Sequence, residues 1–319
     1  MASTIQEIKN LYDAGVPLFT KDALRKIAQK LSTVQQTPPH ISVPITVTGI
    51  NGTEYQILAG GDPWLAPEGS KWVINYRSIQ SLTVHKDTQF RNSNTAYLSL
   101  GIIACTWVPK VDTLLKNPQP SKEWLLHDFQ DRERQWKASK AYEELRTALS
   151  AIKTPFVLDK LVAVALGPLV FRCAHLEHSM IQSVLVSAIH SNLLERGILS
   201  ASSKIYVQDP AYTQLDQDVL SSVGFNVIDD PEAFLMLDDS SVLVSISPDI
   251  PVKQIVVDIC RPAIIIWSKV WDNEESLDFY ITDPTSSRVD KMLKEEYYEL
   301  EFPVHKNYSG LIMYVRKTA

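Results

Sequence analysis

The sequence is poor in cysteine and lacks the segments that direct a chain to a membrane. Its three cysteines, Cys105, Cys173 and Cys260, are odd in number and far apart, so they predict neither a disulfide framework nor a zinc site. The start of the chain does not show the charged and then apolar pattern of a signal peptide. No apolar run reaches the ~18 residues that a membrane span requires. These absences predict a soluble, reduced and cytoplasmic protein.

An excess of positive charge is also missing. The 31 lysines and arginines are outnumbered by 37 acidic residues, and the net charge is −6 at pH 7. This balance argues against a dedicated DNA-binding domain, although a local basic patch on an acidic body remains compatible with it. The chain is 45% hydrophobic and 21% charged, which is typical of a globular protein and excludes a disordered tail.

The glycine-rich motifs of nucleotide-binding proteins are missing as well. Only Gly167 lies in the first predicted crossover, where the dinucleotide fingerprint requires three glycines. Asp209 follows a later strand, too far along the chain for a ribose-binding acid at the usual spacing of ~20 residues. There is no Gly-x-x-x-x-Gly-Lys-Ser/Thr segment. We therefore expect neither a standard NAD site nor ATP-driven chemistry, and no cofactor.

The first part of the chain, 1–120, is predicted to form two helices and a small antiparallel sheet. Thr20 is placed to cap the second helix, whose apolar residues recur at helical spacing. From residue 41 the pattern changes to strands, and Asn51-Gly52 is a strong turn signal between two of them. Residues 121–150 are then predicted to form one long, charged helix.

The second part, 121–319, alternates apolar strands with helices. Strands are expected at 161–166, 205–207, 225–228, 242–246 and 263–267. This alternation predicts an α/β domain with a Rossmann-like, doubly wound parallel sheet, beside the small N-terminal β-rich subdomain. A helix is expected at 289–299, and residues 311–315 are expected to form an edge strand.

Polar residues gather where the predicted strands end, which is where open parallel sheets bind ligands. His175, Glu177 and His178 follow the first strand and are candidates for a general acid or base. Ser247 follows the fourth strand and is a candidate nucleophile. The alternative is that these side chains cap the next helices. His175 and His178 have no evident third partner, so we expect no metal.

Four further residues are candidates for substrate binding: Gly167, Asp209, Tyr212 and Asp249. If the strands before them are neighbours, Asp209 and Asp249 face one crevice and can hold a guanidinium or amine through charge-assisted hydrogen bonds. The alternative for both acids is again helix capping. The charged helix offers four cations that can contact phosphates, or that can instead pair with neighbouring acids on a solvated face: Arg132, Arg134, Lys137 and Lys140.

Several segments resemble the sensitivity-to-red-light-reduced domain family. They are 164–168 with its Gly167, Gln182 in the following helix, 206–212 with its Asp-Pro, and 223–227. The sequence departs from the family pattern at Pro168 and Leu169, where a glycine and a serine are usual. Residues 11–24 and 283–289 look like the two ends of the fungal branch of this family.

Fungal proteins of this kind include the arginine-containing cyclodipeptide synthases. The resemblance therefore implies synthesis of a cyclic dipeptide in secondary metabolism from arginyl-tRNA and a second aminoacyl-tRNA. In this interpretation Glu177, Asp209 and Asp249 recognise arginine, a rim hydroxyl or histidine assists the reaction, and the four helical cations bind tRNA. The ester of an aminoacyl-tRNA is already activated, so the missing ATP motif is no objection. The wider family implies the alternative, a non-enzymatic regulatory protein related to transcription, the clock or haem.

Overall fold

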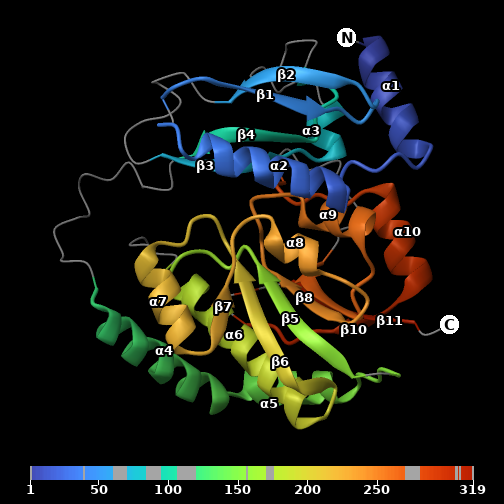
Figure 1. The fold of residues 1–319 in the computed structure, drawn as a ribbon. Helices are drawn as coiled ribbons and strands as arrows, with labels where there is room; N and C mark the ends of the chain where they lie inside the picture. The colour runs from blue at the N-terminus through green and yellow to red at the C-terminus, as the bar shows by residue number, and fades with distance from the viewer. Residues whose placement is uncertain are drawn as a thin grey trace. The chain divides into compact units, whose positions relative to one another are not determined.

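The computed structural model describes most of the chain, with gaps (Figure 1). The described residues are 2–38, 40–59, 70–83, 95–105, 120–155, 157–169, 176–269, 281–305, 308 and 310–317. By their internal packing they form two units, each assembled from separate stretches of sequence. Unit 1 consists of Met1–Lys110, Asp249–Ile259 and Glu274–Val289, and unit 2 consists of Val111–Pro248, Cys260–Asn273 and Asp290–Ala319.

Unit 1 combines short helices with paired strands. Its described helices are α1 (Ala2–Asp13), α2 (Lys21–Val34), α3 (Ile79–Thr83) and α9 (Val252–Ile259), and its strands are β1 (Val43–Thr48), β2 (Glu54–Ala59), β3 (Lys71–Tyr76) and β4 (Leu100–Cys105). Thr20 caps α2 as predicted, because its hydroxyl accepts a hydrogen bond from the amide of Ala23 at 3.0 Å. The strands form two antiparallel pairs, β1–β2 and β3–β4, rather than the one small sheet predicted.

A buried carboxylate ties the distant segments of unit 1 together. Asp258 on α9 accepts hydrogen bonds from the amides of Leu18 and Phe19 at 2.6 and 3.1 Å. The same carboxylate pairs with Arg288 at 2.9 Å, and the guanidinium of Arg288 lies 3.9 Å from the ring centre of Tyr12. Three stretches that are far apart in the sequence therefore meet at one ionic centre.

Unit 2 carries the large sheet and most of the helices. Its described elements, with α10 beginning at the end of unit 1, are α4 (Lys122–Lys137), α5 (Lys140–Ser150), β5 (Leu158–Val164), α6 (Leu176–Glu195), β6 (Leu199–Gln208), α7 (Gln214–Ser222), β7 (Phe225–Val227), α8 (Glu232–Met236), β8 (Ser241–Ser245), β9 (Ile264–Ser268), α10 (Ser287–Glu296), β10 (Tyr297–Glu301) and β11 (Leu311–Arg316). The long helix predicted over 121–150 is thus two helices. Ser139 breaks it, because its hydroxyl accepts from the amide of Tyr142 and caps α5.

The large sheet has seven strands in the order β10-β11-β9-β8-β5-β6-β7. The five strands from β5 to β9 are parallel, and β11 runs antiparallel between β9 and β10. The predicted α/β class with a mostly parallel sheet is confirmed. The predicted edge strand at 311–315 is wrong in its position, because residues 297–301 form β10 outside it, although the sequence pattern predicts 297–299 as the end of a helix, and residues 311–315 of β11 are buried.

The hydrophobic core of unit 2 lies on one face of this sheet. Alternate strand residues such as Ala163, Val244 and Ile266 face the apolar sides of α4, α5, α6 and α7 (Figure 1). The other residues of the same strands, among them Val164, face the opposite side and are also buried. Burial of both faces explains why the strands have no polar alternation in the sequence.

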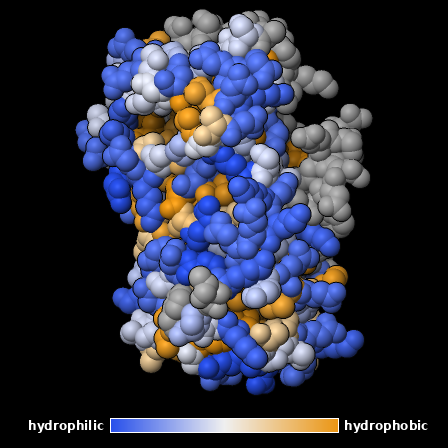
Figure 2. All heavy atoms as spheres, turned by 90° about the vertical axis from the view of Figure 1, so that its right-hand side faces the viewer, coloured by the Kyte–Doolittle hydropathy of each residue, from blue (hydrophilic) through white to orange (hydrophobic). Residues whose placement is uncertain are grey.

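Hydrophilic residues predominate on the molecular face drawn in Figure 2, and the hydrophobic residues there occur in separate groups. Large apolar side chains that stand out into solvent include Leu58, Trp124, Val157, Tyr298 and Val304. Exposed apolar residues in such small numbers are normal on a folded protein. Within the described ranges, no helix combines the length and the apolarity needed to cross a membrane.

Candidate functional site

Backbone strain is concentrated at the point where the strand order of the large sheet reverses. The chain runs outward from β5 through β6 and β7 on one side, and from β8 to β9 on the other. In the described part of the chain, the non-glycine residues with positive φ are Ala165, at 58°, and Ser247, at 50°. Each follows the carboxyl end of one of the two strands at this switch point, and each costs roughly 1–2 kcal/mol relative to the usual conformation. Strain of this kind gathers at functional sites.

Two carboxylates fix the turn after β5. Asp209 accepts hydrogen bonds from the amides of Gly167 at 2.8 Å and Ala211 at 2.9 Å. Asp216, which is fully buried, accepts from the amide of Leu169 at 2.7 Å. Asp216 also accepts from the amide and the hydroxyl of its own helix cap, both at 2.7 Å. The acids of the β6–α7 segment therefore hold the rim of the site by binding its backbone.

Gly167 is required in this turn for two reasons. Its φ of 75° lies in the left-handed region, which other residues adopt only with strain. In addition, a Cβ atom at this position would lie 2.5 Å from the hydroxyl oxygen of Ser179 on α6. The glycine thus brings the turn against α6. Since its amide is already bound to Asp209, that amide is not available to a phosphate.

Two buried polar groups face the same side of the sheet at this edge. Ser245 and Trp267 are paired in register on the neighbouring strands β8 and β9, and both are fully buried. Neither the Ser245 hydroxyl nor the Trp267 indole nitrogen has a hydrogen-bond partner among the residues that the structure describes. The Trp267 ring packs against Tyr314 of β11, with the ring centres 6.1 Å apart. A buried polar group without a partner is costly, so this pair marks a second kind of strain at the rim.

The predicted catalytic residues are only partly visible. His175 and the side chain of Glu177 lie outside the described residues, whereas His178 is half-buried on α6. Ser247 is exposed at the strained turn after β8. The amide of Lys253, in the first turn of the next helix α9, donates to the carboxylate of Asp283 at 2.9 Å and not to the hydroxyl of Ser247. The catalytic roles of these four residues stay predictions.

The acidic crevice predicted from Asp209 and Asp249 rests on strands that are not neighbours. β5 lies between β6 and β8, so the premise of adjacent strands is wrong. Asp249 is exposed and belongs to unit 1, whereas Asp209 belongs to unit 2 and binds backbone amides. Tyr212 is part of the core, where burial, together with Asp209 and Asp216, raises the pKa of its hydroxyl well above the usual range.

Each of the four predicted tRNA-binding cations has an acidic partner one helical turn away. The pairs are Arg132–Asp128 at 2.9 Å, Arg134–Asp131, Lys137–Glu133 at 3.1 Å and Lys140–Glu144 at 3.1 Å. Lys140 lies on α5 and the other three cations on α4. This arrangement favours the solvated-face alternative, since oppositely charged side chains three or four residues apart stabilise a helix by pairing along its surface. A tRNA-binding role for the four cations stays a prediction.

No group of three or more histidine, cysteine, aspartate or glutamate side chains that could hold a metal ion occurs within the described ranges. Within the described ranges, Cys105 and Cys260 form no disulfide. Burial and the charge of Asp249 raise the pKa of Cys105, which makes its thiol a poor nucleophile. Cys173 and His175 lie outside the described residues.

Comparison with known families identifies the family of this chain. The family model of the SRR1 domain (sensitivity to red light reduced) matches residues 145–314, which is more than half of the chain. The chain belongs to the SRR1 domain family. The matched residues include β5 to β10, most of β11 and the strained switch point. No curated protein matches the sequence.

Solved structures that resemble this SRR1-domain protein do so weakly. One is the pyocyanin biosynthetic protein PhzM, at 15% identity, with 62% of each chain covered and a TM-score of 0.30. Another is phosphoethanolamine N-methyltransferase 1 of Haemonchus contortus, at 8% identity, with 63% of this chain and 51% of that chain covered and a TM-score of 0.28. The MycE methyltransferase of the mycinamycin pathway has 12% identity, 98% and 96% coverage and a TM-score of 0.30. The chain spans less than two thirds of the length of the first two proteins, and we draw nothing about function from likeness this weak.

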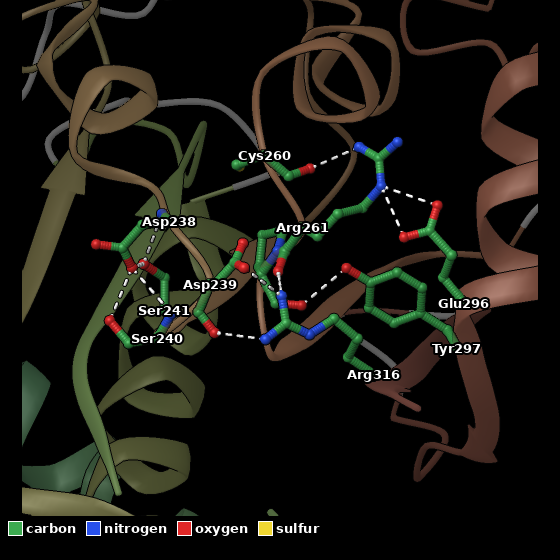
Figure 3. Close-up of polar contacts among 10 residues, drawn as sticks. Asp238, Asp239, Ser240, Ser241, Cys260, Arg261, Glu296, Tyr297 and Arg316 are labelled. Carbon is green, nitrogen blue, oxygen red and sulfur yellow. Dashed lines mark hydrogen bonds and ion pairs between the residues drawn. The ribbon is translucent and has the colours of Figure 1, made fainter. Parts of the chain in front are cut away.

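The opposite edge of the SRR1-domain sheet is a contrast to the switch point. Figure 3 shows that polar side chains at the start of β8 and β9 bind one another. Arg261 pairs with Glu296 at 3.0 Å, and Arg316 pairs with Asp239 at 3.0 Å and also donates to the carbonyl of Arg261 at 2.7 Å. The Tyr297 hydroxyl donates to a backbone carbonyl at 2.8 Å. This network holds strand ends together and is structural.

Asp238 anchors the same edge. Burial raises its pKa, but hydrogen bonds from Lys160, Ser241 and Ser240 outweigh burial and lower the pKa to about 2. The Ser241 hydroxyl donates to the carboxylate at 2.8 Å and accepts from the Asp238 amide at 3.0 Å. Ser241 and Ser245 are the first and last residues of one buried strand, and among the described residues the hydroxyl of Ser241 has partners whereas that of Ser245 has none.

The sequence analysis missed Ser245, Trp267, Asp216 and Ala165 as residues of interest. The sequence feature that could have indicated Ser245 is a hydroxyl at the end of an otherwise apolar strand, two residues before Ser247. Asp216 stands three residues after Thr213, which is a capping-box spacing, but its contact with the turn after β5 requires the fold.

Proposed function

We propose that this SRR1-domain protein is a non-enzymatic regulatory protein, in the area of transcription, the clock or haem, rather than an aminoacyl-tRNA-dependent synthase. Membership of the family supports this interpretation. The observation that carries it is the engagement of Asp209. Both oxygens of its carboxylate accept hydrogen bonds from backbone amides, so the acid has a structural task at the place where a synthase would need to hold arginine.

The energetics of the turn after β5 support the same proposal. A carboxylate that turns from its amides to a guanidinium would leave the amides of Gly167 and Ala211 without it. A hydrogen bond to a charged group is worth ~1.5–3 kcal/mol, so the two bonds together weigh heavily against release. The second proposed acid, Asp249, follows a strand that is not a neighbour of β6.

One observation favours the synthase as a second candidate. Ser247 is an exposed hydroxyl on a strained turn at the switch point, which is where a nucleophile belongs in an open parallel sheet. The two candidates predict different results for a variant that lacks both Ser247 and His178. A regulator keeps its function in this variant, because neither side chain takes part in chemistry. A synthase loses its product.

The test combines an enzyme assay with a test in cells. Purified protein is incubated with arginyl-tRNA and each other aminoacyl-tRNA in turn, and cyclic dipeptides are sought by mass spectrometry. We expect none. In cells that lack the gene, we expect altered transcript levels that both the wild type and the His178→Ala/Ser247→Ala variant restore. A cyclic dipeptide that disappears with the double variant would establish the synthase and refute the regulator.

A further inference from the structure

The unpartnered groups on β8 and β9 have a consequence for ligand binding. Because Ser245 and Trp267 are paired in register, their side chains project from the same face of the sheet at its carboxyl edge. We propose that this edge binds a small, uncharged molecule whose carbonyl oxygen accepts a hydrogen bond from Ser245, with Trp267 as the neighbouring donor. The proposal goes beyond the regulatory function and does not depend on it.

The chemistry of the surroundings selects the class of ligand. Ser245 lies between Val164 of β5 and Trp267 of β9, and Leu243 and Ile265 precede them on the same face; all of these side chains are buried. An indole N–H only donates and a hydroxyl can donate, so the pair calls for an acceptor. None of these five residues carries a charge. Burial of an anionic acceptor among them would cost much free energy, because no counter-ion is present among these five residues. Burial of a ketone or amide oxygen that accepts a hydrogen bond costs much less.

The strained turn after β8 is the proposed means of access, because the turn after β5 is held by Asp209 and Asp216. Ser247 lies two residues after Ser245 and has a left-handed conformation. A rearrangement that returns Ser247 to an ordinary conformation relieves this strain beside the end of β8. A bound ligand then gives the Ser245 hydroxyl a hydrogen-bond partner. The ligand therefore stabilises the rearranged conformation relative to the one described above.

The experiment uses the full chain with 15N-labelled tryptophan indoles and cyclohexanone as the probe. The resonance of Trp267 is assigned from the spectrum of a Trp267→Phe variant. We expect a saturable downfield shift of the Trp267 indole proton on titration with cyclohexanone. In Ser245→Ala the apparent affinity should fall about fivefold, which corresponds to one neutral hydrogen bond of about 1 kcal/mol. Ser241→Ala is the matched control from the same strand and should leave the affinity unchanged.

Three results would overturn the proposal. The Trp267 resonance could remain unmoved by cyclohexanone, which would mean that the edge takes no such ligand. The Ser245→Ala variant could bind as tightly as the wild type, which would remove Ser245 from the site. Acetate could shift the resonance as strongly as cyclohexanone, which would contradict the choice of an uncharged acceptor. None of these outcomes bears on the cyclic dipeptide assay, so the two proposals fail separately.

Discussion

Two buried serines on β8 provide a direct test of the unpartnered hydroxyl. Ser241 and Ser245 are both fully buried on the same face of one strand, but Ser241 exchanges two hydrogen bonds with Asp238, at 2.8 and 3.0 Å. The Ser245 hydroxyl has no partner within the described part of the chain. Substitution of each serine by alanine therefore removes a hydroxyl of the same size from similar surroundings, with opposite effects on hydrogen bonding.

The two substitutions are expected to change the free energy of unfolding by different amounts. Ser241→Ala removes a hydrogen bond to a carboxylate and should destabilise the protein by ~1.5–3 kcal/mol. Ser245→Ala removes a desolvated hydroxyl that has no bond to lose, and should stabilise the protein by ~1 kcal/mol or leave it unchanged. The difference between the variants should then be at least ~1.5 kcal/mol.

Urea unfolding of the full chain measures this difference. The transition is followed by far-ultraviolet circular dichroism, and an unchanged slope with denaturant shows that a shifted midpoint reports stability. A loss of stability in Ser245→Ala as large as that in Ser241→Ala would refute the reasoning, because it would mean that the Ser245 hydroxyl is bonded in the folded protein.

Three further predictions concern the rim and the opposite edge. Gly167→Ala should destabilise the protein by ~1–2 kcal/mol or more, because it adds a side chain at φ 75° against Ser179, and Ser179→Ala should recover part of the loss in a thermal melt of the double variant. Asp216→Ala should cost ~3 kcal/mol or more in urea unfolding, since it removes the buried acceptor of three hydrogen bonds, whereas an unchanged midpoint would contradict the clamp. The pKa of Asp238 is lowered from its usual value near 3.8 to about 2, so its contribution to stability is complete above about pH 4 and is lost as the pH falls through 2. Acid titrations of the wild type and of Asp238→Asn should diverge in that window, and parallel curves would refute the shift.

Much of the fold of unit 2 could be predicted because its strands are short apolar runs bounded by turn residues. The run 161–166 overlaps β5 (Leu158–Val164) but extends into the turn after it, and the alternation with helices predicted the mostly parallel sheet. The position of β11 could not be predicted in the same way. Its apolar residues are compatible with an edge strand or an interior strand. Its interior position follows from β10, which pairs with it on the outer side. Tyr297 and its neighbours continue the charged pattern of α10, which hid β10 in the sequence.

The candidate site was harder to predict, because its features depend on contacts between distant residues. The position of Asp209 after a strand was evident, but its bond to the Gly167 amide depends on β6 lying next to β5. The condition for pairing Asp209 with Asp249, that their strands are neighbours, is not met, because β5 lies between β6 and β8 and no local pattern in the sequence encodes the strand order. A hydroxyl without a partner, as at Ser245, can be recognised only when all neighbouring donors and acceptors are placed.

The ionic centre at Asp258 has a consequence for any attempt to divide the protein. The amides of Leu18 and Phe19 depend on a carboxylate that the chain supplies some 240 residues later, and Arg288 comes later still. A fragment of residues 1–120 would be made without either partner, and a fragment of residues 121–319 would carry the Asp258–Arg288 pair without the amides of Leu18 and Phe19. Unit 1 can therefore be completed only after nearly the whole polypeptide has been synthesised.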